Sequence, residues 1–248
     1  MRALEYWLLN YRRTWMSSVV SAFLAPLLYL GAMGFGLGTM VQDRAGGIPY
    51  AQFVAPALLT ALAMQTGISE STFTVMAAVK WQRQYHAMLA TPLTVIDVLL
   101  GHLAFTTLRI AMAVVAFLGT GALLGAFTHW QVLVAVPVAV LCGVAHATPT
   151  MAYAVRQEGG NGFNLLFRFV VTPMFLFAGT FFPVDQLPAA MRPLAWVTPL
   201  WHATEVCRDL ALGVFDPLVQ LAHVAYLLPW AVIGLWLSVR SYTRRLAV

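Results

Sequence analysis

The chain has 248 residues, of which 60% are hydrophobic and only 9% are charged. Ordinary soluble domains carry about 25% charged residues, so this composition excludes a water-soluble fold. A formal net charge of +5 is compatible with nucleic-acid binding. The basic residues, however, stand at the ends of apolar runs and form no single basic surface. We therefore predict an integral membrane protein with the lipid bilayer, and no nucleic acid, as its partner.

Six apolar runs are long enough to cross a hydrocarbon core, which takes about 20 residues of helix. They cover residues 18–39, 53–77, 95–125, 131–153, 164–182 and 218–239. No connection between them has room for a further domain of about 100 residues. The sequence therefore predicts an all-α polytopic membrane protein with six transmembrane helices, forming a single domain over residues 1–248.

The basic residues also predict the orientation of the chain. Residues 1–10 lack the apolar core of a signal peptide, so we expect the N-terminus to stay in the cytoplasm. Ten basic residues then fall on the inner side and three on the outer side, with Arg109 inside a span. This asymmetry follows the positive-inside rule and places both termini in the cytoplasm. The outer residues are Arg44, Arg192 and Arg208.

The N-terminal segment 1–16 is predicted to be an amphipathic helix in the membrane interface, or else a cytoplasmic extension of the first span. Its apolar residues recur at helical spacing: Leu4, Trp7, Leu8, Tyr11 and Trp15. Within the first span, Gly34 and Gly38 form a GxxxG pair, which lets helix backbones approach closely. A dimer contact and a chance occurrence of this pattern are equal alternatives.

The connection at residues 78–93 is the most polar stretch inside the membrane region and is expected on the cytoplasmic side. One helical face carries Trp81, Tyr85, Met88 and Leu89. The residues that project elsewhere are Gln82, Arg83 and His86. This pattern predicts a short helix lying across the cytoplasmic surface. Thr94 and Asp97 then have capping-box spacing, so the next helix is expected to begin there.

Two ionisable residues lie inside predicted spans, where they are expensive and mark either functional sites or internal pairs. Glu70 shares a helical face with Thr66 and Thr74, and Arg109 lies in the next span. Because both helices grow from the same hairpin, the side chains of Glu70 and Arg109 can meet at similar depth. Three alternatives follow: the two side chains pair, they line a polar substrate path, or Arg109 snorkels to the membrane surface.

The connection between the last two spans, residues 183–217, is rich in proline, which breaks helices. We expect short re-entrant half-helices there, such as residues 201–212. Irregular backbone at membrane depth is tolerated only where protein or a water-filled cavity covers it. This segment is therefore predicted to cap the outer end of a pathway.

No energy source or cofactor site is recognisable within the chain. A P-loop needs Gly-Lys followed by Ser or Thr, but the only lysine, Lys80, follows Val79. Neither HExxH nor CxxC occurs, and Cys142 and Cys207 are isolated. The chain is therefore predicted to be no enzyme and to hold no metal or cofactor of its own.

Two stretches of the chain resemble ABC-2 type transporter permeases, especially the branch with the lipo-oligosaccharide (nodulation-factor) and daunorubicin-type exporters. They are residues 81–97, WQRQYHAMLATPLTVID, and residues 175–188, FLFAGTFFPVDQLP. Pro-Leu-Trp-His at residues 199–202 and residues 205–213 extend the likeness. The order of the elements and the length agree over nearly the whole chain.

The resemblance implies a permease in the bacterial inner membrane that exports an amphipathic cargo: a glycolipid, a lipid-linked saccharide or a hydrophobic drug. It implies a second permease copy or paralogue and two cytoplasmic ABC ATP-binding subunits, which bind ATP and Mg. The first, second and fifth spans would line the exit path and the dimer contact. The residues of the coupling helix would be Lys80, Trp81, Gln82, Arg83, Gln84, Tyr85, His86 and Met88. The outer re-entrant segment would include Pro183, Asp185, Pro188, Pro199, His202, Glu205 and Arg208.

Two other classes of function remain open at this point. An ion-gradient-driven secondary transporter needs a titratable side chain near the midplane of the membrane, and Glu70 is the candidate. An intramembrane transferase could use His202 and Glu205, whose i, i+3 spacing places them on one helical face.

Overall fold

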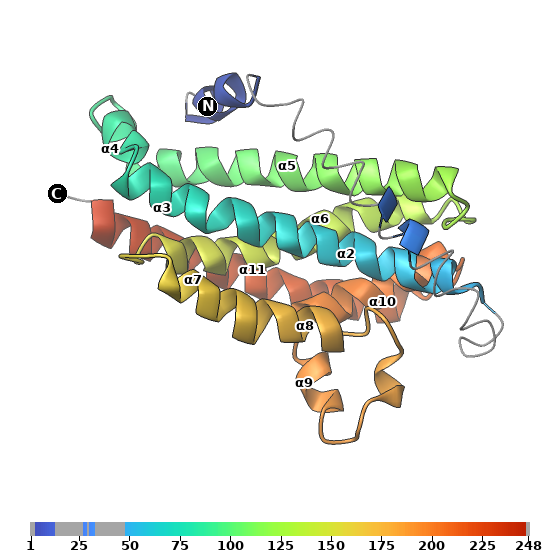
Figure 1. The fold of residues 1–248 in the computed structure, drawn as a ribbon. Helices are drawn as coiled ribbons and strands as arrows, with labels where there is room; N and C mark the ends of the chain where they lie inside the picture. The colour runs from blue at the N-terminus through green and yellow to red at the C-terminus, as the bar shows by residue number, and fades with distance from the viewer. Residues whose placement is uncertain (1–2, 13–26, 29, 33–47, 247–248) are drawn as a thin grey trace.

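A computed structural model describes residues 3–12, 27–28, 30–32 and 48–246, and these residues form a bundle of helices without strands (Figure 1). Residues 3–12 form a short helix. The later helices are α2 (Tyr50–Ser71), α3 (Phe73–Lys80), α4 (Gln84–Leu89), α5 (Val95–Leu123), α6 (Val132–Ala154), α7 (Asn161–Leu166), α8 (Thr172–Phe177), α9 (Arg192–Trp196), α10 (Pro199–Ala211) and α11 (Pro217–Leu246). The predicted all-α class is confirmed for this part of the chain.

Four helical stretches among the described residues are long and apolar enough to cross a membrane, by length and composition. They are Tyr50–Lys80, Val95–Leu123, Val132–Ala154 and Pro217–Leu246, and each matches a predicted span. The predicted span 164–182 corresponds to a shorter apolar helix, Asn161–Phe177. The predicted span 18–39 falls mostly outside the described residues. A polytopic membrane fold is therefore supported, and the number of six spans stays a prediction.

Local sequence signals determine where the helices around α4 begin and end. At the start of α5, the Thr94 hydroxyl accepts a hydrogen bond from the Asp97 amide at 3.2 Å, and the Asp97 carboxylate accepts from the Thr94 amide at 2.9 Å. The predicted capping box is thus confirmed. Between α2 and α3 the helix breaks at Thr72, whose φ and ψ are −98° and −95°.

Small residues bring α6 into close contact with α2 and α11. A Cβ added to Gly67 of α2 would overlap the Gly143 carbonyl oxygen, and one added to Gly143 would lie 2.8 Å from a carbonyl oxygen of α2. On the α11 side, a Cβ on Gly234 would overlap the Thr148 hydroxyl, and Ser238 donates a 2.6 Å hydrogen bond to the Thr148 carbonyl. Close backbone approach through small residues is typical of helix packing in lipid.

The buried apolar side chains form two main clusters. The larger one joins α2, α5, α6 and α10. The smaller one gathers the 3–12 helix, α3 and α4 around the first turns of α5 and the last turns of α6 and α11. Figure 1 shows α4 at one end of the bundle and α10 at the other. Each end therefore has its own core.

The 3–12 helix packs along α5. Ala3 lies against Gly101, where a Cβ would leave no room for it. Further along, Trp7 is buried and stacks on His102, with 4.2 Å between ring centroids. This segment is therefore fastened to the bundle by Ala3 and Trp7, whereas Leu8 of the predicted stripe is 39% exposed. Its predicted place in the membrane interface stays a prediction.

Candidate functional site

The α4 hairpin divides its side chains between the protein and the surface. Tyr85 and Met88 are buried, whereas Trp81 is 67% exposed. Sequence periodicity placed Trp81 on the same helical face as Tyr85, and this prediction is wrong. The helix begins only at Gln84, and Arg83 before it has a left-handed φ of 50°, so Trp81 is out of helical phase. The exposed residues of the hairpin include Trp81, Gln82, Arg83 and His86.

Tyr85 is held between α5 and α11. Its hydroxyl is hydrogen-bonded to His102 Nδ1 and lies 3.4 Å from the Tyr242 hydroxyl. Burial, and then the neighbouring Tyr242, raise the pKa of the Tyr85 hydroxyl, so it keeps its proton in the contact with His102. Since His102 stacks on Trp7, this one tyrosine ties α4 to two long helices and to the 3–12 segment.

An ion-pair cluster lies at the same end of the bundle. Lys80 Nζ, at the end of α3, is 2.7 Å from Glu158 Oε2, and Arg245 Nη2 of α11 is 2.6 Å from Glu158 Oε1. The hydrogen bond from Lys80 and the charge of Arg245 hold the pKa of the Glu158 carboxyl below its ordinary value. Glu158 is exposed, so salt screens the cluster. Lys80, which was predicted to belong to the coupling helix, thus bonds to Glu158 of the same chain.

Glu70 and Arg109 meet between α2 and α5. Arg109 Nε donates to Glu70 Oε1 at 3.1 Å, and the side chains are 22% exposed for Arg109 and 19% for Glu70. The Arg109 guanidinium also lies 5.0 Å from the centroid of the Tyr11 ring. Among the three alternatives drawn from the sequence, this contact favours the ion pair. Thr66 and Thr74 are half-buried, and no hydroxyl bond of theirs occurs among the described residues.

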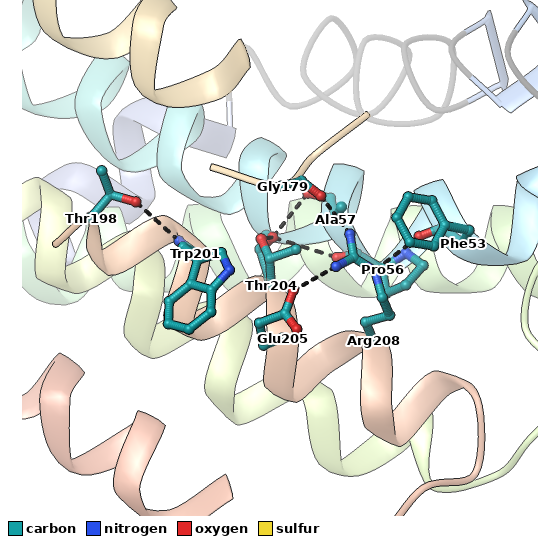
Figure 2. A network of polar contacts seen from close by, with 10 residues as sticks. Phe53, Pro56, Ala57, Gly179, Thr198, Trp201, Thr204, Glu205 and Arg208 are labelled. Atoms are coloured by element: carbon teal, nitrogen blue, oxygen red, sulfur yellow. Dashed lines mark hydrogen bonds and ion pairs between the residues drawn. The ribbon is translucent and has the colours of Figure 1, made fainter. Parts of the chain in front are cut away.

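Arg208 lies in a buried polar network at the α10 end of the bundle (Figure 2). Its Nη1 donates to Glu205 Oε1 at 2.6 Å, and its Nη2 donates to the Gly179 carbonyl at 2.5 Å. Its Nε donates to the Phe53 carbonyl at 3.4 Å, and the guanidinium lies 4.1 Å from the centroid of the Phe53 ring. The side chain is 9% exposed. Arg208 therefore fastens α10 to α2 and to the chain that follows α8.

Burial dominates the electrostatics of this network. It raises the pKa of the Glu205 carboxyl, which the charge of Arg208 opposes, and it lowers the pKa of Arg208. A second link joins the same two helices, because the hydroxyls of Thr60 and Thr204 are 2.9 Å apart. These polar groups bond to one another and thereby anchor α10 to α2.

The remainder of the segment 183–217 is organised by backbone contacts. Arg192 Nη2 donates to the Asp185 carbonyl at 2.6 Å and closes the loop before α9. The helices α9 and α10 are the half-helices that the proline pattern predicted, whereas their re-entry into a membrane stays a prediction. The three predicted prolines stand before a turn or at the first residue of a helix: Pro183, Pro188 and Pro199.

His202 joins α10 to α11. Its Nε2 is 2.9 Å from the Trp196 carbonyl oxygen, which can only accept, so Nε2 carries the proton. Its Nδ1 is 2.8 Å from Nδ1 of His223, which donates in the neutral pair. Its ring also stacks on Tyr226 with 3.9 Å between centroids. Since Glu205 bonds to Arg208 instead, His202 and Glu205 do not form the pair that an intramembrane transferase would need.

Several residues of these contacts were missed by sequence reasoning. Their partners are far away along the chain, and the only signal was a polar or aromatic residue near the end of an apolar run. They are His102, Glu158, His223, Tyr242 and Arg245. The predicted dimer contact at Gly34 and Gly38 lies outside the described residues.

Comparison with known proteins identifies the family of the chain. The sequence profile of the ABC-2 type transporter family matches residues 4–212. The chain belongs to the ABC-2 type transporter family. It is 33% identical over 245 residues to Nodulation protein J of Rhizobium meliloti (strain 1021), covering 97% of this chain and 92% of that protein. Inner membrane transport permease YadH of Escherichia coli (strain K12) is 23% identical over 241 residues, which cover 94% of this chain and 93% of the permease.

As a member of the ABC-2 type transporter family, the chain is a multi-pass transmembrane subunit of a transporter. Family membership implies association with ABC ATP-binding subunits. The resemblance seen in residues 81–97 and 175–188 is thereby confirmed. Residues 81–97 hold the exposed α4 hairpin, and residues 175–188 lead into the segment fastened by Arg208.

Proposed function

We propose that this ABC-2 transporter chain is the permease of an ATP-driven exporter, which moves an amphipathic substrate out of the cytoplasm or the inner leaflet. Two ABC ATP-binding subunits, which bind ATP and Mg, supply the energy. A second permease copy or paralogue completes the membrane part. The observation that carries the proposal is α4, which is anchored by buried Tyr85 and Met88 and leaves Trp81, Arg83 and His86 exposed for a partner.

The proposed mechanism uses this division of the hairpin. The exposed side chains bind the ATPase, and the buried ones pass its movement to the bundle. ATP-driven closure of the ATPase pair then favours one of two arrangements of the permease, as any ligand-driven conformational change requires. The hairpin is attached to α5 and α11 through Tyr85, so its displacement reaches both helices.

The proposed substrate is a lipo-oligosaccharide, another glycolipid or a lipid-linked saccharide, with hydrophobic drugs as the alternative. Support comes from the 33% identity to Nodulation protein J together with the resemblance to the lipo-oligosaccharide exporter branch. The likeness to an inner membrane transport permease supports a bacterial inner membrane as the location, with both termini in the cytoplasm.

The test exchanges the exposed side chains of the hairpin. Arg83→Gly preserves the turn, because glycine adopts positive φ readily, and Trp81→Ala removes the exposed aromatic ring of the hairpin. Aromatic and arginine contacts dominate interfaces, so we expect the double variant to bind the ATPase about tenfold more weakly. Co-purification of the ATPase and substrate-stimulated ATP hydrolysis measure this loss, with membrane insertion unchanged.

The matched control is Trp130→Ala. Trp130 is 72% exposed and lies between α5 and α6, at the end of the bundle away from α4. This variant is expected to bind the ATPase normally. Wild-type co-purification and stimulation in the Trp81→Ala/Arg83→Gly variant would overturn α4 as the docking site.

An ion-gradient-driven transporter is the alternative that the sequence left open. It requires Glu70 to exchange a proton or bind an ion during transport. The Glu70 carboxylate instead holds Arg109 at 3.1 Å between α2 and α5, which gives it a role in joining these helices. The geometry therefore supports the ATP-driven exporter better.

A further inference from the structure

Helix α11 connects the two ends of the bundle. It runs over 30 residues, Pro217–Leu246, which corresponds to about 45 Å at 1.5 Å per residue. Figure 1 shows its C-terminal end on the side of α4 and its beginning beside α10. Much of its surface is exposed and apolar, including Leu221, Ile233 and Trp236. Its other face packs along α6, its main neighbour, and also contacts α10 and α5. Three sets of polar or close contacts stand out within this packing.

The first contact holds the C-terminal end of α11 to the α4 hairpin. Inside the protein, the Tyr242 hydroxyl lies 3.4 Å from the hydroxyl of Tyr85, and both rings are fully buried. At the surface, Arg245 shares the Glu158 carboxylate with Lys80. Any displacement of the hairpin must therefore move this end of α11 or break both contacts.

The second contact holds the middle of α11 to α6. Thr148 of α6 donates from its hydroxyl to the Ala231 carbonyl at 3.2 Å and accepts from the Ser238 hydroxyl at 2.6 Å. Between them Gly234 lets the backbones approach so closely that a Cβ would overlap Thr148. This is the point where α11 has the least freedom to move away.

The third contact holds the beginning of α11 to α10 and to the turn before it. His223 Nδ1 lies 2.8 Å from His202 Nδ1, and the direction of this bond is set because His202 Nε2 donates to the Trp196 carbonyl. One turn further, the Tyr226 hydroxyl donates to the Val197 carbonyl at 2.8 Å. Movement of this end of α11 is thereby passed to the segment 183–217.

We propose that α11 is a lever, which pivots at Thr148 and carries the movement of α4 at Tyr242 to α10 at His223. The two arms are comparable, since Tyr242 is about 12 Å and His223 about 17 Å along the axis from Gly234. The inference rests on the proposed function, because the force on α4 comes from the ATPase. Tyr242 and His223 are then positioning residues for transport, although neither touches the ATPase.

The test follows the α10 end of the bundle while nucleotide acts at the α4 end. A cysteine introduced at Leu194 of α9, which is 68% exposed, is a specific reporter because the native Cys142 and Cys207 are buried. In the complete complex in lipid nanodiscs, where reagents reach both faces of the membrane, the rate of its reaction with a maleimide is measured with and without ATP. The comparison includes Tyr242→Leu, His223→Phe, the double variant, and Trp236→Leu as an exposed control on the same helix.

The lever predicts that ATP changes the labelling rate in the reference protein and in Trp236→Leu, and that Tyr242→Leu and His223→Phe each lose most of this change. Residues acting in series give non-additive effects, so the double variant should lose no more than either single one. ATPase co-purification should be unaffected. A preserved ATP-dependent change in either single variant, or additive losses, would overturn the lever.

Three further outcomes can be told apart. If Tyr242→Leu does not fold, Tyr242→Phe removes only the hydroxyl contact and is expected to reduce the ATP-dependent change, and an unchanged response there contradicts the lever. If the reference chain recruits no ATPase, the proposed function fails, and the lever falls with it. A reference complex that hydrolyses ATP and transports, yet shows no change at Leu194, overturns the lever alone.

Discussion

At the scale of single residues, Arg208 determines how the α10 end is held. A buried guanidinium must find acceptors for its donors, and Arg208 finds one carboxylate and two carbonyl oxygens from three parts of the chain. Glu205 alone would be a partly buried charge, and burial raises the pKa of its carboxyl while the charge of Arg208 opposes this shift. The pair of Arg208 and Glu205 therefore serves mainly to hold α10 in one position.

Arg208→Met tests this role. It keeps much of the side-chain volume but leaves Glu205 and two carbonyl groups without their donor. Breaking a fully buried pair costs about 3–5 kcal/mol, and the partial exposure of Glu205 reduces the expected loss in free energy of unfolding to about 2–3 kcal/mol. Thermal unfolding of the purified protein measures it. Arg156→Ala, an exposed arginine at the other end of the bundle, should leave the melting temperature unchanged; equal melting of both variants would contradict the anchoring role.

At the scale of elements, the sequence predicted what depends on neighbouring residues. Apolar runs located the four long helices, and the spacing of Thr94 and Asp97 located the start of α5. The prediction of which residues of α4 share a face was partly wrong, because the left-handed turn at Arg83 interrupts the helical phase between Trp81 and Tyr85. The spacing of apolar residues does not reveal a single left-handed residue.

Contacts between distant elements were predictable only where a hairpin imposes equal depth. Glu70 and Arg109 flank such a hairpin, and they pair. Glu158 meets Arg245 across 87 residues, and apolar patterning does not say which helices are neighbours. The same limit applies to the segment 183–217, whose half-helices followed from proline but whose contacts did not.

The contact between α2 and α6 gives a prediction at this scale. Gly67→Ala places a Cβ on the Gly143 carbonyl oxygen, so the helices must separate, at a cost of about 1–3 kcal/mol in the free energy of unfolding. In Gly119→Ala the added methyl meets no atom within 4 Å, and alanine favours the helix. Thermal unfolding should therefore show a loss only for Gly67→Ala. A stable Gly67→Ala variant would mean that the two backbones are not in close contact.

At the scale of the whole molecule, the two ends of the bundle have different tasks. The α4 end carries the exposed side chains of the proposed ATPase contact and fixes the hairpin to α5, α11 and the 3–12 helix. The α10 end fixes the segment 183–217 through Arg208 and His202. Helix α11 touches both ends. This ABC-2 family chain therefore contains a continuous path from the proposed ATPase contact to the proposed exit.

In the proposed exporter, ATP hydrolysis on a separate subunit drives movement along this path. The most direct measurement is export of a fluorescent glycolipid by the chain reconstituted in vesicles, with and without its ATP-binding subunits. We expect transport only when both the ATP-binding subunits and ATP are present, and none from a pH gradient alone. Transport by the isolated chain under a pH gradient would contradict it and would assign the driving force to an ion gradient.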